Sequence, residues 1–175
     1  MNTRPAPVLQ ATRYHWQGEA PDPVAIPALF EGTRGRRVVA YLIDVVIVVC
    51  LAGLLWLAGS VFIVLTLGAL TPLIILGATL LPIAYHTFFI GGPRNATLGM
   101  QMMDLRVVAW NGNRPSYLQA AVQTALFYLT VPTTNGLILL VSLFNDRGRC
   151  VHEMLCGTLT INDLALPEIE DPRDR

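Results

Sequence analysis

The stretch Arg36-Arg37-Val38-Val39-Ala40-Tyr41-Leu42-Ile43-Asp44 decides the fold, because it opens the first long apolar segment of the chain. Two arginines precede the segment, and Asp44 lies inside it, with apolar residues resuming at Val45. A charged side chain at such a depth costs roughly 2.5–3.5 kcal/mol on insertion scales, so it normally faces protein and has a partner. The sequence therefore predicts a polar partner for Asp44 elsewhere in the chain.

The composition is that of a membrane protein. Of the 175 residues, 53% are hydrophobic and 14% are charged, whereas soluble domains average about 25% charged residues. The 12 basic and 12 acidic residues cancel, which gives no reason to expect nucleic acid as a partner, so the expected surroundings are a lipid bilayer. The odd number of cysteines, with one in an apolar run, predicts no disulfide framework. The spacing of Cys150 and Cys156 is not a usual zinc spacing, so we expect ordinary thiols and no metal.

Residues 38–90 form an almost unbroken apolar run in which Asp44 is the only formally charged residue. A helix needs about 20 residues to cross a bilayer, so the run predicts two transmembrane helices. The turn between them has two candidate positions. A turn at Gly59-Ser60 gives a short first helix, whereas a turn at 68–72 lengthens the first helix and shortens the second.

The ends of the two helices predict their orientation. We expect the second helix to end near Ile90 and to bend near Pro82, because membrane helices tolerate proline. Basic residues lie before the first helix and after the second, and the turn has none; they are Arg34, Arg36, Arg37, Arg94, Arg106 and Arg114. By the positive-inside rule, the N-terminus and the 91–115 segment are cytoplasmic.

Two short segments outside the apolar run are typical of strands. Residues 104–110 are rich in β-branched residues and are followed by a turn signal at 111–113. Residues 157–162 have a similar character near the C-terminus. Since isolated strands are marginal, we expect the two to pair against the membrane face. The predicted fold class is an all-α membrane protein with a small cytoplasmic strand pair.

A third apolar segment, 117–144, is interrupted by proline and glycine at 131–136. It is long enough for one crossing and short for two. Arg147 and Arg149 follow it directly, which favours a segment that breaks at Pro132 and returns to the cytoplasm. A re-entrant hairpin and two short tilted helices both satisfy this requirement, because irregular backbone at membrane depth must be buried in protein or line a cavity.

The segments divide the chain into three parts. A proline-rich cytoplasmic tail at 1–32 is expected to be flexible, and an acidic tail at 163–175 is expected to be disordered. Residues 33–162 form the membrane domain between them. No secretory signal is expected, because the N-terminus lacks a basic start followed by an apolar core.

Several polar groups fall at the same shallow depth below the cytoplasmic surface. Asp44 lies about 9 Å into the first helix, and His86 lies about 6 Å from the end of the second. Gln119 and Gln123 lie about 4–10 Å into the third segment. Two interpretations of Asp44 stay open: a protonatable pair with His86 that couples proton movement to transport, or a helix-locking residue. The lack of a second intramembrane acid favours the lock, and Arg37 is interpreted as an interfacial anchor.

Motifs across residues 33–162 resemble the RDD family of bacterial membrane proteins, named for one arginine and two aspartates. The motifs are Arg37 through Asp44, Thr97-Leu98-Gly99-Met100, Leu105 through Val108 with Asn111-Gly112, and His152-Glu153 through Gly157-Thr158. The position of the family's second aspartate is Glu153 here, the loop lysine is Met100, and a basic residue of the third helix is Gln119 or Gln123. The resemblance implies a multi-pass protein of the bacterial inner membrane that is suspected of transport.

The sequence supports two functions, neither of them enzymatic. The first is a transporter, or a transporter subunit, for a small solute or cation; the embedded region is too short to enclose a broad path alone, so a homo-oligomer or a partner membrane protein is expected. The second is a membrane scaffold or assembly factor that docks through the strand pair. No phosphate-binding loop, metal pair or nucleophile elbow is present, so no catalytic, metal or cofactor residue is assigned. The candidate functional residues are Arg37, Asp44, His86, Gln123 and Glu153.

Overall fold

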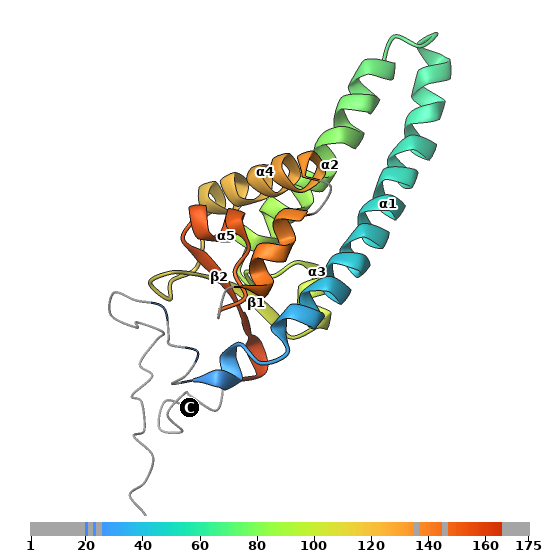
Figure 1. Ribbon diagram of the computed structural model, residues 1–175. Coiled ribbons are helices and arrows are strands. Elements are labelled where there is room, and N and C mark those ends of the chain that lie inside the picture. The colour runs from blue at the N-terminus through green and yellow to red at the C-terminus, as the bar shows by residue number, and fades with distance from the viewer. Residues whose placement is uncertain (1–19, 21–22, 24–25, 135–136, 145–146, 166–175) are drawn as a thin grey trace, which may run out of the picture.

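The computed structural model consists of a long helical hairpin that projects from a compact head (Figure 1). It describes residues 20, 23, 26–134, 137–144 and 147–165. The elements in chain order are the 3-10 helix η1 (Pro27–Leu29), α1 (Thr33–Leu65), α2 (Thr71–Gly91), α3 (Leu98–Met102), β1 (Leu105–Ala109), α4 (Tyr117–Thr133), the 3-10 helix η2 (Leu137–Leu143), α5 (Val151–Leu155), β2 (Thr158–Asn162) and the 3-10 helix η3 (Asp163–Ala165).

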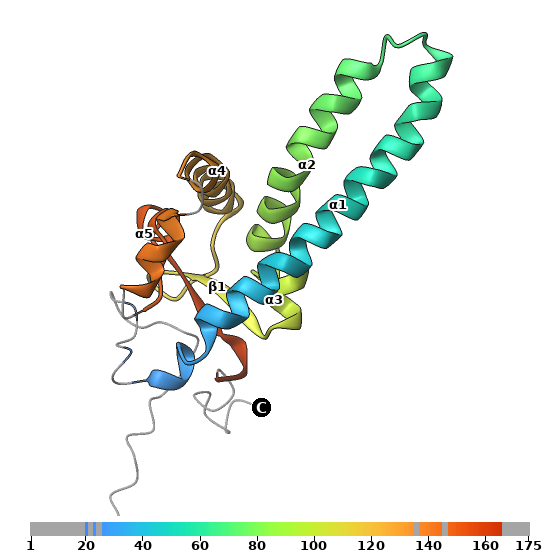
Figure 2. The same cartoon turned by 45° about the vertical axis from the view of Figure 1, so that its right-hand side comes forward.

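Helices α1 and α2 form the hairpin, with 33 and 21 residues respectively. By length and composition both are able to cross a membrane, and only 11% of the most apolar part of each is buried. A membrane helix exposes apolar side chains to the hydrocarbon chains of the lipid. This degree of exposure is therefore expected of a transmembrane helix. The prediction of two transmembrane helices is therefore supported, and the strand pair lies at the base of the hairpin (Figure 2).

The turn of the hairpin lies at 66–70, between the end of α1 and the start of α2. Of the two candidate positions, Gly59-Ser60 is wrong, and the later candidate at 68–72 is close, since the turn begins two residues before it. Gly68 has a φ of +88°, a left-handed conformation that glycine adopts without steric cost. Gly59 instead lies inside α1, where a Cβ atom would come within 3.0 Å of the Ile74 side chain. This glycine lets the two helices pack closely.

The second helix ends at Gly91, one residue past the expected end at Ile90, and Pro82 lies inside it. In the third segment, α4 continues through Pro132 and ends at Thr133. The chain then forms η2, which packs against both α4 and α5. The break is therefore one residue from its expected position, and whether the segment crosses the bilayer or re-enters stays a prediction.

The strand pair is confirmed. Strands β1 and β2 are antiparallel, in a register that runs from Leu105 opposite Asn162 to Ala109 opposite Thr158. Successive side chains of a strand point to opposite faces, and both faces of this sheet are covered. On one face Val108, Leu159 and Ile161 pack with Leu29 of η1. On the other, Val107 packs with Ile90 of α2 and Ala120 of α4.

Packing on the sheet extends beyond the predicted limits of the membrane domain. Leu29, which precedes residue 33, is fully buried, and Ala165, which follows residue 162, is also buried in the same cluster. Most of the predicted tails, 1–32 and 163–175, lies outside the described residues. The head thus recruits short segments from both ends of the chain, which provides the additional contacts that a two-stranded sheet needs.

Candidate functional site: two polar clusters around one cavity

Asp44 is buried at 2% exposure and accepts three hydrogen bonds. The Tyr85 hydroxyl donates to Oδ1 at 2.8 Å, the Thr97 hydroxyl donates to Oδ2 at 2.6 Å, and the Gly99 backbone N–H donates to Oδ1 at 2.9 Å. The three donors belong to α2, to the residue that caps α3, and to α3 itself. One carboxylate therefore joins three helices, which is the arrangement expected of a locking residue.

The start of α3 explains why the donors point at Asp44. The Thr97 hydroxyl accepts a hydrogen bond from the Met100 N–H as a helix N-cap, so its own proton is available to the carboxylate. The Tyr85 hydroxyl likewise accepts from the Leu98 N–H at 3.3 Å and directs its proton to Asp44. Each partner thus acts as a donor, which fits a carboxylate in its acceptor-only form.

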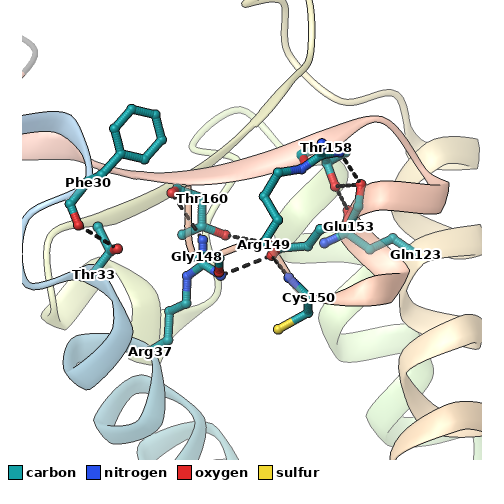
Figure 3. Close-up of polar contacts among 10 residues, drawn as sticks. All are labelled: Phe30, Thr33, Arg37, Gln123, Gly148, Arg149, Cys150, Glu153, Thr158 and Thr160. Atoms are coloured by element: carbon teal, nitrogen blue, oxygen red, sulfur yellow. Dashed lines mark hydrogen bonds and ion pairs between the residues drawn. The ribbon is translucent and has the colours of Figure 1, made fainter. Parts of the chain in front are cut away.

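A second cluster surrounds Glu153 of α5 (Figure 3). Nη1 of Arg37 lies 2.9 Å from Oε2 of Glu153 and 2.6 Å from the carbonyl oxygen of Gly148. Nη2 of Arg37 donates to the carbonyl of Thr160 at 3.1 Å. Arg37, near the start of α1, is therefore bound to the C-terminal part of the head. This contact adds a structural role to the interfacial anchor expected from the sequence.

Both carboxylate oxygens of Glu153 have partners. Oε1 accepts from the Thr160 hydroxyl at 2.7 Å, and Oε2 also accepts from the Cys150 N–H at 2.8 Å. Burial alone would raise the pKa of Glu153, but the charges of Arg37 and His152 and these two hydrogen bonds outweigh it and hold the pKa below its usual value. Glu153 is therefore the anionic centre of this cluster.

Arg149 also contacts α5 and β2, through hydrogen bonds from its guanidinium to backbone carbonyls. Its Nε donates to the carbonyl of Thr158 at 2.8 Å, and its Nη2 donates to the carbonyl of Glu153 at 2.9 Å. The guanidinium carbon also lies 4.6 Å from the ring centroid of Trp110, a cation–π distance. Burial lowers the pKa of Arg149. The residue joins α5 to β2, so its role in this geometry is structural.

A cavity of about 250 Å³ lies between the two clusters. Helix α2 packs against α1 and also against α4, and the rings of Tyr41 on α1 and Phe127 on α4 meet at 5.6 Å between centroids. The cavity is lined by residues of α1, α2, α4, α5 and β2 and of the segments near them: Arg34, Arg37, Val38, Ala40, Tyr41, Asp44, His86, Ile90, Met100, Gln123, Thr124, Phe127, Ser142, Gly148, Cys150, His152, Glu153 and Thr160.

All five candidate residues from the sequence line this cavity: Arg37, Asp44, His86, Gln123 and Glu153. The polar side chains that the sequence places at one depth thus lie in the wall of the same cavity. Gln123 accepts a hydrogen bond from the Thr158 hydroxyl at 2.9 Å. Gln119, the alternative to Gln123, donates to the Cys156 carbonyl and is not among the lining residues.

The hydrogen bonds of His86 do not involve Asp44. Nδ1 of His86 lies 2.9 Å from the carbonyl oxygen of Pro82 and 3.3 Å from the Tyr128 hydroxyl. The tyrosine one residue earlier, Tyr85, takes the position beside the carboxylate. The two residues thus share the cavity wall without the direct pairing on which a simple proton relay would depend.

The sequence analysis gives no role in the polar clusters to Tyr85, Thr97, Thr160 or Arg149, although Thr97 lies in one of the family motifs. Thr97 carried a usable signal, because threonine is a preferred N-cap residue at the start of a helix, and a cap hydroxyl has a proton to donate. Thr160 lies in a strand whose alternate residues face the core of the head. Tyr85 had no local signal, since its partner is 41 residues away.

Within the described part of the chain, no group of three or more histidine, cysteine, aspartate or glutamate side chains is placed to hold a metal ion. Cys150 and Cys156 are free thiols there, and burial raises the pKa of Cys150 to about 11.

Comparison with known proteins gives one match. The model of the RDD family matches residues 32–157 of the chain. No curated protein and no solved structure matches the chain. The matched span contains both polar clusters apart from Thr158 and Thr160, which follow it directly.

Proposed function

Because this chain belongs to the RDD family, we propose that it is a non-enzymatic transporter, or a subunit of one, for a small solute, with the cavity between α1 and α4 as the solute-binding site. The observation that supports the proposal is the cavity itself, whose wall combines the arginine and acid of the opening motif with groups from α2, α4 and α5. Binding pockets in proteins are typically concave and apolar with a few convergent polar groups. This cavity has that composition.

The size and place of the cavity suit a small solute. Its volume of about 250 Å³ corresponds to about eight water molecules at roughly 30 Å³ each. It lies at the base of the hairpin, where a solute would meet the membrane surface. The proposal places the head in the bacterial cytoplasm and requires a homo-oligomer or a partner membrane protein, since a path across the bilayer needs more walls than one hairpin.

The experiment is an unbiased flux measurement. Purified protein is reconstituted in liposomes with a defined mixture of small metabolites and inorganic cations, and the solutes that change inside are identified by mass spectrometry and atomic absorption. We expect at least one solute to move faster than in protein-free liposomes. Val38→Phe, at the cavity wall, should slow this movement, while Val39→Phe, its neighbour outside the cavity lining, should not. Equal contents in all samples would contradict the proposal.

A second candidate, a membrane scaffold or assembly factor, is favoured by the saturation of both buried carboxylates. Asp44 and Glu153 each receive three or more protein donors, as structural residues do. This function predicts a partner protein that copurifies in mild detergent and is lost when the sheet side of the head is altered, for example by Leu164→Glu at an exposed position beside β2. Val38→Phe would leave that partner bound.

A further inference from the structure

The buried or partly buried charged groups of the lining, Asp44, Glu153 and Arg37, already make hydrogen bonds within the protein. Arg34, the remaining arginine of the lining, is exposed. Both oxygens of Asp44 and both oxygens of Glu153 accept hydrogen bonds from neighbouring residues. Both terminal nitrogens of Arg37 donate, one of them to Glu153 and to a carbonyl. A bound cation would need several oxygen ligands, and a bound anion would need a free guanidinium. Either ion would have to displace hydrogen bonds that hold the helices together.

The surface left for a ligand is therefore mostly hydrocarbon and aromatic. The apolar residues of the lining come from α1, α2, α3 and α4 and are Val38, Ala40, Tyr41, Ile90, Met100 and Phe127. Burying apolar surface stabilises a complex in proportion to the area removed from water. A solute with a hydrocarbon body gains this contribution, whereas a hydrated ion would lose its water shell against the same walls.

Three lining residues retain a buried polar atom with no hydrogen-bond partner in the described part of the chain. They are Arg37, whose Nε is unpartnered, Thr124, whose Oγ1 is unpartnered, and His152, whose Nδ1 is unpartnered. Thr124 and His152 are more than nine-tenths buried, at 3% and 8% exposure. An unsatisfied buried polar atom destabilises the protein. A hydroxyl or carbonyl group of a solute that reached one of these atoms would supply the missing hydrogen bond without bringing a charge.

The edge of the cavity coincides with the surface of α1. Val38 and Tyr41 line the cavity and are also exposed, at 61% and 40%. Both lie near the start of a helix that is long and apolar enough to cross a membrane. A solute dissolved among lipid chains thus meets the cavity from the side of α1.

From these observations we infer that the cavity binds an uncharged amphiphile with a short hydrocarbon body and one hydroxyl or carbonyl group. The inference takes from the proposed function only that this cavity is the solute site, and it names the class of solute.

The test uses Cys150, which lines the cavity, as a reporter. Cys50 and Cys156 are replaced by serine, the protein is placed in lipid nanodiscs, and the rate at which methyl methanethiosulfonate modifies Cys150 is followed by intact-protein mass spectrometry at pH 8.5. The rate is measured with 1-hexanol, hexylammonium or hexanoate, which share a hydrocarbon chain and differ in the charge of the head group. Val38→Phe and Val39→Phe are examined in the same background.

We expect 1-hexanol to slow the modification of Cys150 at least threefold and in a saturable way, with hexylammonium and hexanoate much less effective at equal concentration. Val38→Phe should slow the modification by itself and remove the effect of 1-hexanol, whereas Val39→Phe should behave as the parent protein. Equal protection by a charged probe, or equal behaviour of the two valine variants, overturns the inference. Protection without solute flux would leave the inference standing and refute the transport proposal, while flux without protection would do the reverse.

Discussion

Arg37 near the start of α1 and Glu153 in α5 form a largely buried ion pair, with 2.9 Å between Nη1 and Oε2, across 116 residues of sequence. The pair connects the hairpin to the C-terminal half of the head. Carbonyl and hydroxyl groups add hydrogen bonds to both partners, but removal of either residue leaves the other charge without its counterion. The free-energy consequence of such a removal is much larger than the net value of the pair.

We predict that Arg37→Met and Glu153→Gln each lower the free energy of unfolding by about 3–5 kcal/mol, because each leaves an uncompensated buried charge or its donors. The double variant should lose less than the sum of the two. Equilibrium unfolding in mixed micelles measures all three. Arg106→Met is the matched control, since the Arg106–Asp163 pair is more than a third exposed on both sides and contributes at most about 1 kcal/mol. Strictly additive losses would show that the two residues act independently.

The second prediction concerns Asp44. Asp44→Leu leaves the hydroxyls of Tyr85 and Thr97 and the Gly99 N–H without an acceptor, and at about 1–3 kcal/mol for each unsatisfied group this should prevent folding. Asp44→Asn keeps one acceptor oxygen and should lower the unfolding free energy by less. Asp163→Asn, at an exposed carboxylate, should have little effect.

The asparagine variant also separates the two interpretations of Asp44. If Asp44 is a lock, the folded Asp44→Asn protein keeps any proton-linked flux in liposomes that carry a pH-sensitive dye. A flux that disappears in a protein of normal thermal stability would instead assign a proton-carrying role to Asp44.

The hairpin, the strand pair and the shared depth of the polar groups were predictable from the sequence, because they depend on periodicity and helix length. Asp44 marked the layer, since a carboxylate in an apolar run needs partners. Composition did not decide between the two candidate turns. In the structure Gly59 lies inside α1 and packs closely against Ile74 of α2, a contact between residues that the local pattern does not relate.

The partners of the two carboxylates were also beyond local reasoning. The sequence places His86 at the depth of Asp44, but at 3.6 residues per turn neighbouring residues point in different directions, and the orientation of α2 brings Tyr85 to Asp44. The sequence interprets Arg37 as an interfacial anchor. Its actual partner, Glu153, comes from the far end of the matched family region, and only the fold brings the two together.

The third prediction follows from the contact between α1 and α3. A Cβ atom at Gly99 would collide with the backbone carbonyl of Ala40 and come within 2.9 Å of the Asp44 carboxylate carbon. Backbone cannot yield as a flexible side chain does, so Gly99→Ala should separate α3 from α1 and break the hydrogen bond to Asp44. Gly53→Ala is the control within α1, because nothing lies within 4 Å of its added Cβ.

Thermal unfolding followed by circular dichroism in detergent measures this effect. We expect Gly99→Ala to lower the unfolding temperature strongly or to prevent folding, and Gly53→Ala to leave it unchanged or raise it slightly through better helix propensity. A Gly99→Ala protein as stable as the parent would mean that α1 and α3 are not in close contact.

The last prediction is a loss of stability in acid that proceeds in two steps. Burial lowers the pKa of His152 in the folded protein, so below its ordinary value of about 6.5 the unfolded chain binds a proton that the folded chain does not. Despite burial, the charges of Arg37 and His152 with the hydrogen bonds from Thr160 and Cys150 lower the pKa of Glu153. The contribution of Glu153 to the free energy of unfolding is fully present above about pH 4.3. It is lost as the pH falls through the lower pKa that Glu153 has in the folded protein. In both cases the unfolded state binds more protons, so stability rises with pH.

Unfolding midpoints measured between pH 7.5 and 3.5 should therefore fall first below about pH 6.5 and again below about pH 4.3, the ordinary pKa values of the two groups. His152→Asn should reduce the first decline and leave the second. Glu153→Gln should be less stable at neutral pH and should lose the second decline, because it has no carboxylate to protonate. A His152→Asn protein that keeps the full decline between pH 7 and 5 would show that other groups cause it.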